Sequence, residues 1–230
     1  MGGTLSAPRP VAPGSLGVLG GTFDPVHLGH LALAEEAREA LGLERVMFVP
    51  AAVPPHKQGI PMTAAADRAA MVELAIADNP AFGTSRIELE RTGPSYTVDT
   101  LEAIHDTGVD LWLILSAETY REFDTWRRPE RILELARVAV APRDGYELPG
   151  GAGAGSTAAR VTFLDGPRLR VSASEIRGRV AAGRSIRYLV PPAVRRYIAD
   201  HDLYRATTDP ATKPSDAGIM EDNVTRTSAS

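Results

Sequence analysis

The chain has 230 residues, which is enough for one large domain or for one domain with terminal tails. A formal net charge of −4 gives no general basic field for nucleic acid, and the lack of cysteine excludes disulfides and thiolate metal sites. No apolar run is long enough to span a bilayer and residues 1–15 lack the apolar core of a signal peptide, so we expect a cytoplasmic protein with no membrane partner.

Strand-like and helix-like runs alternate along the chain between an N-terminal arm at residues 1–15 and a C-terminal tail at 205–230, both of which we expect to be disordered. The expected strands are 16–19, 45–49, 84–89, 111–115, 138–141 and 161–164, and the expected helices are 28–41, 64–78, 96–105, 128–136, 172–182 and 192–201. This alternation predicts a single α/β domain over residues 16–204, with a doubly wound parallel sheet of Rossmann-like type. Such sheets bind ligands at the carboxyl ends of their strands, where the strand order reverses.

The most distinctive motif directly follows the first expected strand and reads GGTFDPVHLGH over residues 20–30. Gly20 and Gly21 let the backbone approach a phosphate closely, and the helix that follows presents free N–H groups at its start. His27 and His30 add two proton-bearing side chains at that helix start. The motif therefore predicts a phosphate site that carries chemistry. A zinc-binding histidine pair is the alternative, but no third ligand is evident.

A second motif opens the helix expected at 172–182. Ser172 and Glu175 have the spacing of a capping box, which would explain both residues without any ligand. Arg177 is not explained by capping, because a cation near a helix start opposes the helix dipole. An anion bound at this terminus by Ser172, Ser174 and Arg177 would reverse that cost.

The two motifs together resemble the signatures of the H-x-G-H nucleotidyltransferases. Three further strings, PPHK at 54–57, PSYTVDTL at 94–101 and the Phe123–Trp126 pair, resemble the bacterial nicotinate-nucleotide adenylyltransferases within that superfamily. The resemblance extends over roughly residues 16 to 204. It implies the transfer of AMP from ATP to nicotinate mononucleotide, with Mg²⁺ on the phosphates, deamido-NAD and pyrophosphate as products, and no nucleic acid partner.

The resemblance also implies a role for individual residues of this chain. The residues that it implies as catalytic are His27, His30 and Arg177. The residues that it implies for ATP binding are Gly20, Gly21, Thr22, Phe23, Glu118, Ser172 and Ser174, and Gly29 is expected to let the helix approach the nucleotide. Its acceptor-binding residues are Lys57, Thr97, Trp126 and Arg143, and no protein ligands for a metal are implied.

Two departures from the family pattern affect the nucleotide side. Ser116-Ala117-Glu118 stands where the family usually has Gly-x-Asp, and Ala173 replaces the middle serine of the second motif. The alternatives are a sister enzyme whose acceptor is phosphopantetheine or nicotinamide mononucleotide, and a nucleotide-binding regulator without turnover. The sequence leaves the oligomeric state open, with a homodimer as one expectation.

Overall fold

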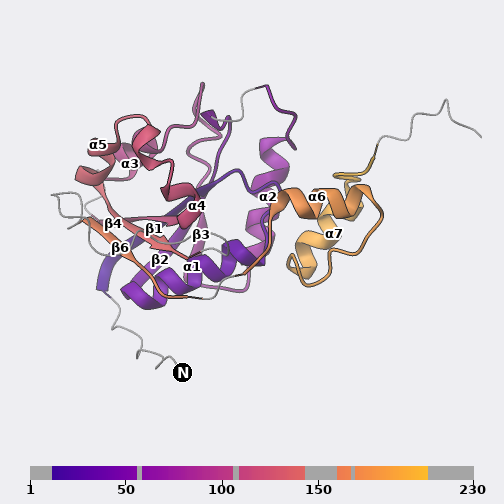
Figure 1. Cartoon of the computed structure of the whole chain (residues 1–230), viewed down its shortest axis with the longest axis horizontal. Helices are drawn as coiled ribbons and strands as arrows, with labels where there is room; N and C mark the ends of the chain where they lie inside the picture. The colour runs from indigo at the N-terminus through magenta and orange to yellow at the C-terminus, as the bar shows by residue number, and fades with distance from the viewer. Residues whose placement is uncertain (1–11, 56–58, 106–108, 143–159, 167–168, 207–230) are drawn as a thin grey trace, which may run out of the picture.

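The computed structural model describes residues 12–55, 59–105, 109–142, 160–166 and 169–206 (Figure 1). Its centre is a parallel sheet of six strands in the order β3-β2-β1-β4-β5-β6. The strands are β1 Ala12–Gly21, β2 Leu43–Pro50, β3 Phe82–Thr84, β4 Asp110–Ser116, β5 Arg137–Ala141 and β6 Val161–Phe163. The predicted doubly wound α/β fold is confirmed, and the strand order reverses between β1 and β4.

Seven helices of the described residues connect and follow these strands. They are α1 Leu28–Leu41, α2 Ala65–Ile76, α3 Thr97–His105, α4 Ala117–Tyr120, α5 Pro129–Leu135, α6 Ala173–Ala181 and α7 Pro192–Asp200, with a 3₁₀ helix at Phe123–Thr125. All six helices expected from the sequence are present, with ends that differ by a few residues at most. The short α4 and the 3₁₀ helix were not expected.

Two strands, β1 and β3, differ most from the sequence-based expectation. β1 begins at Ala12, inside the arm expected to be disordered, because Ala12 pairs with Leu43 of β2 and the Gly14 N–H donates to the Glu44 carboxylate at 2.7 Å. The strand expected at 84–89 was misplaced, since β3 ends at Thr84. After it the chain turns, with the Leu89 N–H donating to the Arg86 carbonyl at 2.8 Å. This turn directs residues 86–90 away from the sheet edge.

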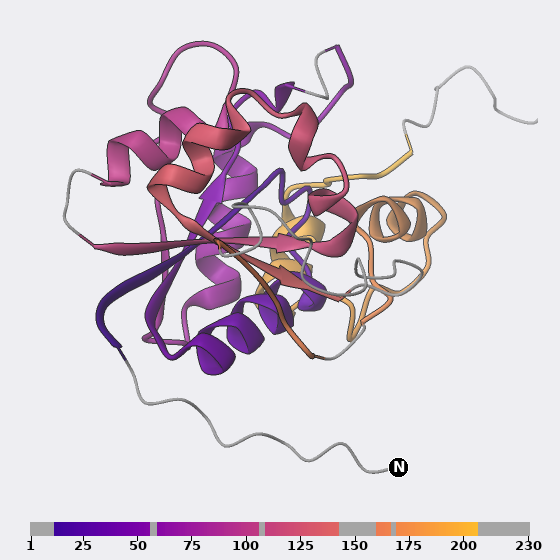
Figure 2. The ribbon, with the colours of Figure 1, turned by 60° about the vertical axis from the view of Figure 1, so that its left-hand side comes forward.

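Apolar side chains cover both faces of the sheet, as expected for parallel strands. Leu19, Phe48 and Ile114 pack on one face with α1 and α2, and this cluster continues into α6 and α7. Val18 and Leu113 point to the opposite face, where α3 and α5 pack. The helices accordingly lie on both sides of the sheet (Figure 2). The strands therefore act as a rigid layer that fixes the loops at their carboxyl ends.

The last two helices lie at one side of the sheet and extend its core past α2, as seen in orange and yellow in Figure 1. α7 packs against α2, and the Tyr197 hydroxyl donates to the Asp67 carboxylate at 2.8 Å. The Leu28 N–H at the start of α1 donates to the Leu189 carbonyl at 3.0 Å. The C-terminal helices are thereby attached to the element that carries the histidines.

Candidate active site

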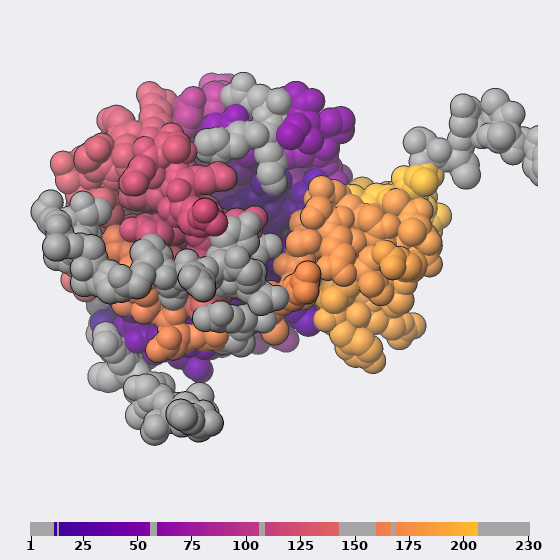
Figure 3. Space-filling view, viewed as in Figure 1, coloured from indigo at the N-terminus to yellow at the C-terminus, as the bar shows by residue number. Residues whose placement is uncertain are grey.

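A cavity of about 700 Å³ lies at the carboxyl ends of β1 and β4, where the strand order reverses. The face is visibly hollowed between the pink residues that follow β4 and the orange α6 (Figure 3). Of the residues that the resemblance assigns to catalysis, ATP or the acceptor, ten line it: Gly20, Gly21, Thr22, Phe23, His27, His30, Thr97, Glu118, Trp126 and Arg177. Three parts of the chain that are distant in the sequence therefore meet in one cavity: the histidine motif, the start of α3 at Thr97, and the segment that contains Trp126.

The two histidines form a stacked pair at the start of α1. Their ring centroids lie 3.7 Å apart with 23° between the planes, and the ring of Phe23 meets His30 edge-on at 5.0 Å. The His27 N–H donates to Nδ1 of His30 at 3.2 Å. An Nδ1 that accepts a hydrogen bond carries no proton in the neutral ring, so the proton of His30 lies on Nε2 and can be donated. Among the described residues, no group of three His, Asp or Glu side chains is placed to hold a metal ion.

Gly29 gives the pair its room. A Cβ atom at this position would lie 3.0 Å from Nδ1 and 3.1 Å from Cε1 of His27, which is closer than the ring can accept without moving. We expected this glycine to let the helix approach a nucleotide. In the structure, the absence of a side chain at Gly29 leaves space for the ring of His27.

Arg177 fixes the loop between β1 and α1. Its Nη1 donates to the Asp24 carbonyl at 2.7 Å, and its side chain lines the cavity. We expected Arg177 near the first turn of its helix, but α6 starts at Ala173. Arg177 therefore belongs to the second turn, where the helix dipole has weakened. Its position is explained by the Asp24 contact more directly than by the dipole.

The C-terminal end of the described chain secures the same loop from another side. The Tyr204 hydroxyl donates to Oδ1 of Asp24 at 2.7 Å, and Oδ2 of Asp24 accepts from the Thr63 N–H at 3.4 Å. Burial, helped by the hydrogen bond to Asp24, raises the pKa of the Tyr204 hydroxyl. The hydroxyl therefore stays protonated and remains a donor to this buried carboxylate.

Ser172 caps the start of α6, which is the serine half of the predicted capping box. The Ser172 hydroxyl accepts from the Glu175 N–H at 3.2 Å and lies 3.2 Å from the Ser174 hydroxyl. Of the four residues Val171–Ser174, Val171 and Ala173 line the cavity. The capping contact explains Ser172 structurally, and contact of either serine with a nucleotide stays a prediction.

Ser116 ends β4 in an ordinary backbone conformation. Its φ of −78° lies in a region that every residue adopts, so glycine is not required here. The Ser116 hydroxyl instead caps α4 by accepting from the Thr119 N–H at 3.3 Å. This short helix places Glu118 at the cavity wall.

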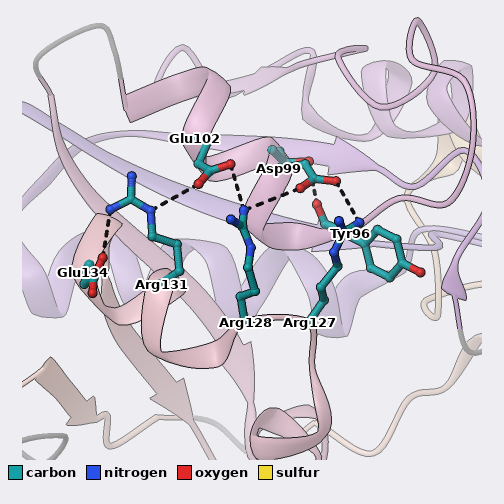
Figure 4. A network of polar contacts seen from close by, with 8 residues as sticks. Tyr96, Asp99, Glu102, Arg127, Arg128, Arg131 and Glu134 are labelled. Atoms are coloured by element: carbon teal, nitrogen blue, oxygen red, sulfur yellow. Dashed lines mark hydrogen bonds and ion pairs between the residues drawn. The ribbon is translucent and has the colours of Figure 1, made fainter.

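The other end of the cavity is built from the start of α3 and the segment that follows the 3₁₀ helix. Trp126 is half-buried and packs on Phe123 with the ring centroids 5.7 Å apart. The guanidinium of Arg127 lies 4.6 Å from the Tyr96 ring centroid and 3.7 Å from the Asp99 carboxylate. Figure 4 shows these contacts continuing along α3 and α5 as an exposed network of ion pairs. The network joins the two segments that carry Thr97 and Trp126.

Two predicted acceptor residues cannot be placed. Lys57 and Arg143 both lie outside the described residues. Pro55 is the last described residue before Lys57, and Pro142 is the last described residue before Arg143. Both of these prolines line the cavity.

A comparison with protein families matches the part of the chain that forms this site. A family model described as cytidylyltransferase-like matches residues 18–179, which is well over half of the chain. The chain belongs to the cytidylyltransferase-like family. The match contains the histidine motif, the cavity and the start of α6 with Arg177.

Curated relatives narrow the position within the cytidylyltransferase-like family. A protein of Roseiflexus sp. named "Probable nicotinate-nucleotide adenylyltransferase" is 49% identical over 194 residues, which cover 83% of this chain and 98% of the relative. A protein of Thermus thermophilus with the same name is 45% identical over 192 residues, covering 83% and 99%. This chain therefore groups with the nicotinate-nucleotide adenylyltransferases and is a nucleotidyltransferase, as the sequence motifs predicted.

A solved structure supports the fold of this family member. The nicotinic acid mononucleotide adenylyltransferase of Plasmodium falciparum, complexed with NaAD, superposes with a TM-score of 0.69 at 15% identity. The superposition covers 83% of this chain and 97% of that one. At this identity the likeness establishes the fold.

Sequence reasoning missed buried polar residues that hold the loops of this transferase. Arg68 of α2 is 1% exposed and donates to the carbonyls of Thr22 at 2.6 Å, Thr63 at 3.0 Å and Ala52 at 3.2 Å. Burial lowers the pKa of its guanidinium. The available signal was a charged residue on the apolar face of α2, where Ala69 and its neighbours are buried.

No helix of the described residues combines the length and the apolar character that a membrane span requires.

Proposed function

We propose that this protein transfers the AMP part of ATP to nicotinate mononucleotide, forming nicotinic acid adenine dinucleotide (deamido-NAD) and pyrophosphate. The observation that carries the proposal is that one cavity is lined both by the stacked His27–His30 pair and by Thr97 and Trp126. An enzyme of this class has to bring two substrates into contact, and such a cavity provides the space. The names of the relatives at 49% and 45% identity favour this acceptor.

At the nucleotide end, the protein supplies hydrogen-bond donors for the triphosphate. We assign His27, His30 and Arg177 to the charge that develops on the α-phosphate and on the departing pyrophosphate. The Nε2 proton of His30 is the most clearly prepared donor, because Nδ1 is already occupied. Residues 20–23 also line the cavity, and we assign them to ATP. We assign Ser172 and Ser174 to phosphate and Glu118 to the ribose.

At the acceptor end, the assignments follow the chemistry of nicotinate mononucleotide. We assign Trp126 to stacking on the pyridine ring. Thr97 is the first residue of α3, where free N–H groups favour the nicotinate carboxylate. Lys57 and Arg143 are proposed for the acceptor phosphate and its surroundings as cations that suit an anion.

The proposed chemistry needs no general base. The acceptor phosphate is already anionic, and one of its oxygens forms a bond to the α-phosphorus while the bond from that phosphorus to the pyrophosphate oxygen breaks. The protein contributes in-line positioning and fixed donors. ATP enters as its Mg²⁺ complex in this proposal. Mg²⁺ keeps most of its waters and binds phosphate oxygens, so the chain needs to supply few ligands.

Pyrophosphate release with three acceptors in parallel tests the proposal. ATP is supplied with nicotinate mononucleotide, nicotinamide mononucleotide or phosphopantetheine, each at the same concentration. We expect turnover with nicotinate mononucleotide and a much lower kcat/KM with the other two. Release with phosphopantetheine alone would assign the chain to a sister reaction, and no release with any acceptor would favour a regulator. A homodimer and a cytoplasmic location remain separate predictions.

A further inference from the structure

Glu88 is a buried carboxylate at the acceptor end of the cavity that none of the assigned roles explains. It lies in the turn that follows β3, is 6% exposed and contributes to the cavity wall. Carboxylates are rarely buried unless they have partners. The partners of Glu88 therefore indicate what it does.

Both partners belong to the segment that opens α3. The Thr100 hydroxyl donates to Oε1 of Glu88 at 2.6 Å. Burial raises the pKa of the Glu88 carboxyl, and the hydrogen bond from Thr100 opposes that rise. The Ser95 hydroxyl lies near Glu88 and lowers the pKa of its carboxyl, as does Arg91, while Asp99 raises it. The carboxylate is thus hydrogen-bonded to Thr100 inside α3 and lies near Ser95, just before the helix begins.

Ser95 extends this contact to the loop after β2. Its Oγ accepts from the N–H groups of Ala52 at 3.0 Å and Val53 at 3.3 Å. The Ser95 N–H also donates to the Val53 carbonyl at 2.9 Å. With two N–H groups directed at Oγ, the hydroxyl proton of Ser95 is oriented toward an acceptor, which Glu88 provides. Ser95 therefore joins the loop after β2 to the segment that opens α3, and Glu88 lies beside this junction.

We propose that Glu88 is a positioning residue for the acceptor, because it locks the loop after β2 to the start of α3. The identity of the acceptor rests on the proposed function. Ala51, Pro54, Pro55, Tyr96 and Thr97 all line the cavity on the two segments that this lock joins. Loss of the lock lets the two walls of the acceptor end separate.

The nucleotide end is held by different contacts. The His27–His30 hydrogen bond and the Arg177–Asp24 hydrogen bond involve neither Glu88 nor its two partners. The lock should therefore affect binding of the acceptor much more than binding of ATP or the rate of the chemical step. A residue that only supported general stability would not separate these quantities.

Steady-state kinetics of Thr100→Val and Glu88→Gln test this separation. Thr100→Val keeps the shape of the side chain but removes the hydroxyl that donates to Glu88. Glu88→Gln replaces one of the two accepting oxygens of the carboxylate by an NH₂ group. We expect each variant to raise the acceptor KM about tenfold, as for loss of a hydrogen bond to a charged group. We expect the ATP KM and kcat to stay within about twofold of wild type. Thr100→Ser, which keeps the hydroxyl, and Glu90→Gln, at an exposed position of the same turn, are the matched controls.

Amide hydrogen exchange provides a test that needs no substrate. The Ala52 and Val53 amides should exchange faster in Thr100→Val and Glu88→Gln than in wild type, and at the wild-type rate in both controls. Unchanged exchange in an active enzyme would overturn the lock, and so would a parallel rise in both KM values. Absence of turnover by the wild-type protein would instead overturn the proposed function, and the exchange rates would still decide whether Glu88 locks the two segments.

Discussion

His30 is the residue whose orientation the structure defines most completely. Its ring stacks on His27, meets Phe23 edge-on, and accepts a backbone N–H through Nδ1. These contacts fix the ring before any substrate binds, so the Nε2 proton is a preorganised donor. Preorganised donors contribute strongly to catalysis because no free energy is spent on reorienting them during the reaction.

Replacing His30 by alanine should therefore reduce turnover severely. We expect kcat of His30→Ala to fall about a thousandfold, on the scale measured for loss of a preorganised donor. Measurement of pyrophosphate release gives kcat directly. His105→Ala, at an exposed histidine near the end of α3, should retain wild-type turnover. Turnover of His30→Ala within tenfold of wild type would contradict the catalytic assignment.

Gly29→Ala tests whether the histidine pair depends on the space beside it. The added methyl group would push the His27 ring away from its position 3.0 Å from the new Cβ. A misplaced catalytic group is costly, so we expect kcat to fall by about tenfold to a hundredfold while the fold is retained. Gly178→Ala in α6 is the control, since a Cβ there meets nothing within 4 Å. Equal kcat values for the two variants would show that His27 tolerates the displacement.

Among the elements, those with strong periodicity were predictable and those set by local hydrogen bonds were not. The parallel strands read as apolar runs, and the helices between them have recognisable lengths and starts. The range expected for β3 was wrong because Ile87 and Leu89 look like strand residues. In the structure the chain turns at Arg86, and Glu88 is buried. α4 was missed because four residues carry too little pattern, and its cap by Ser116 appears only in the structure.

The C-terminal segment after α7 acts on an element far from it in the sequence. Tyr204→Phe removes the donor to the buried Asp24 carboxylate. We expect a loss of about 1.5–3 kcal/mol in the free energy of unfolding, as for hydrogen bonds to charged groups. We also expect a higher KM for ATP, because Asp24 belongs to the loop that joins β1 to the histidines. Urea unfolding and steady-state kinetics measure the two effects.

The matched control for this prediction is Tyr197→Phe. It removes a similar hydrogen bond to Asp67, but between α7 and α2. It should lower stability and leave the KM for ATP unchanged. A KM for ATP that rises equally in both variants would mean that Tyr204 acts only through general stability.

For the molecule as a whole, the sequence identified the residues that face the cavity better than those that support it. The glycines, histidines and Arg177 were recognisable because they occur in short motifs. Arg68 and Glu88 were not, since each contacts loops that are distant in the sequence and come together only in the folded chain. Burial of a charge becomes evident only when its partners are known.

The buried carboxylate also predicts a pH dependence of stability. Burial raises the pKa of Glu88 above its ordinary value of 4.5, so the folded protein binds this proton more tightly than the unfolded chain. Its contribution to stability is fully present below pH 4.5 and is lost as the pH rises through the folded-state pKa. The free energy of unfolding of wild type should therefore fall relative to that of Glu88→Gln as the pH increases over this window. Urea unfolding of both proteins at a series of pH values measures this change, and a wild-type free energy of unfolding that rises relative to that of Glu88→Gln would contradict the prediction.

In the proposed reaction, one cavity brings the α-phosphate of ATP to the phosphate of nicotinate mononucleotide. The most direct test follows label from [α-³²P]ATP and, separately, from [γ-³²P]ATP in the presence of nicotinate mononucleotide. We expect the α-label to appear in the dinucleotide and the γ-label in pyrophosphate, in equal amounts. An α-label that never joins the pyridine nucleotide, or a γ-label transferred to the acceptor, would contradict it.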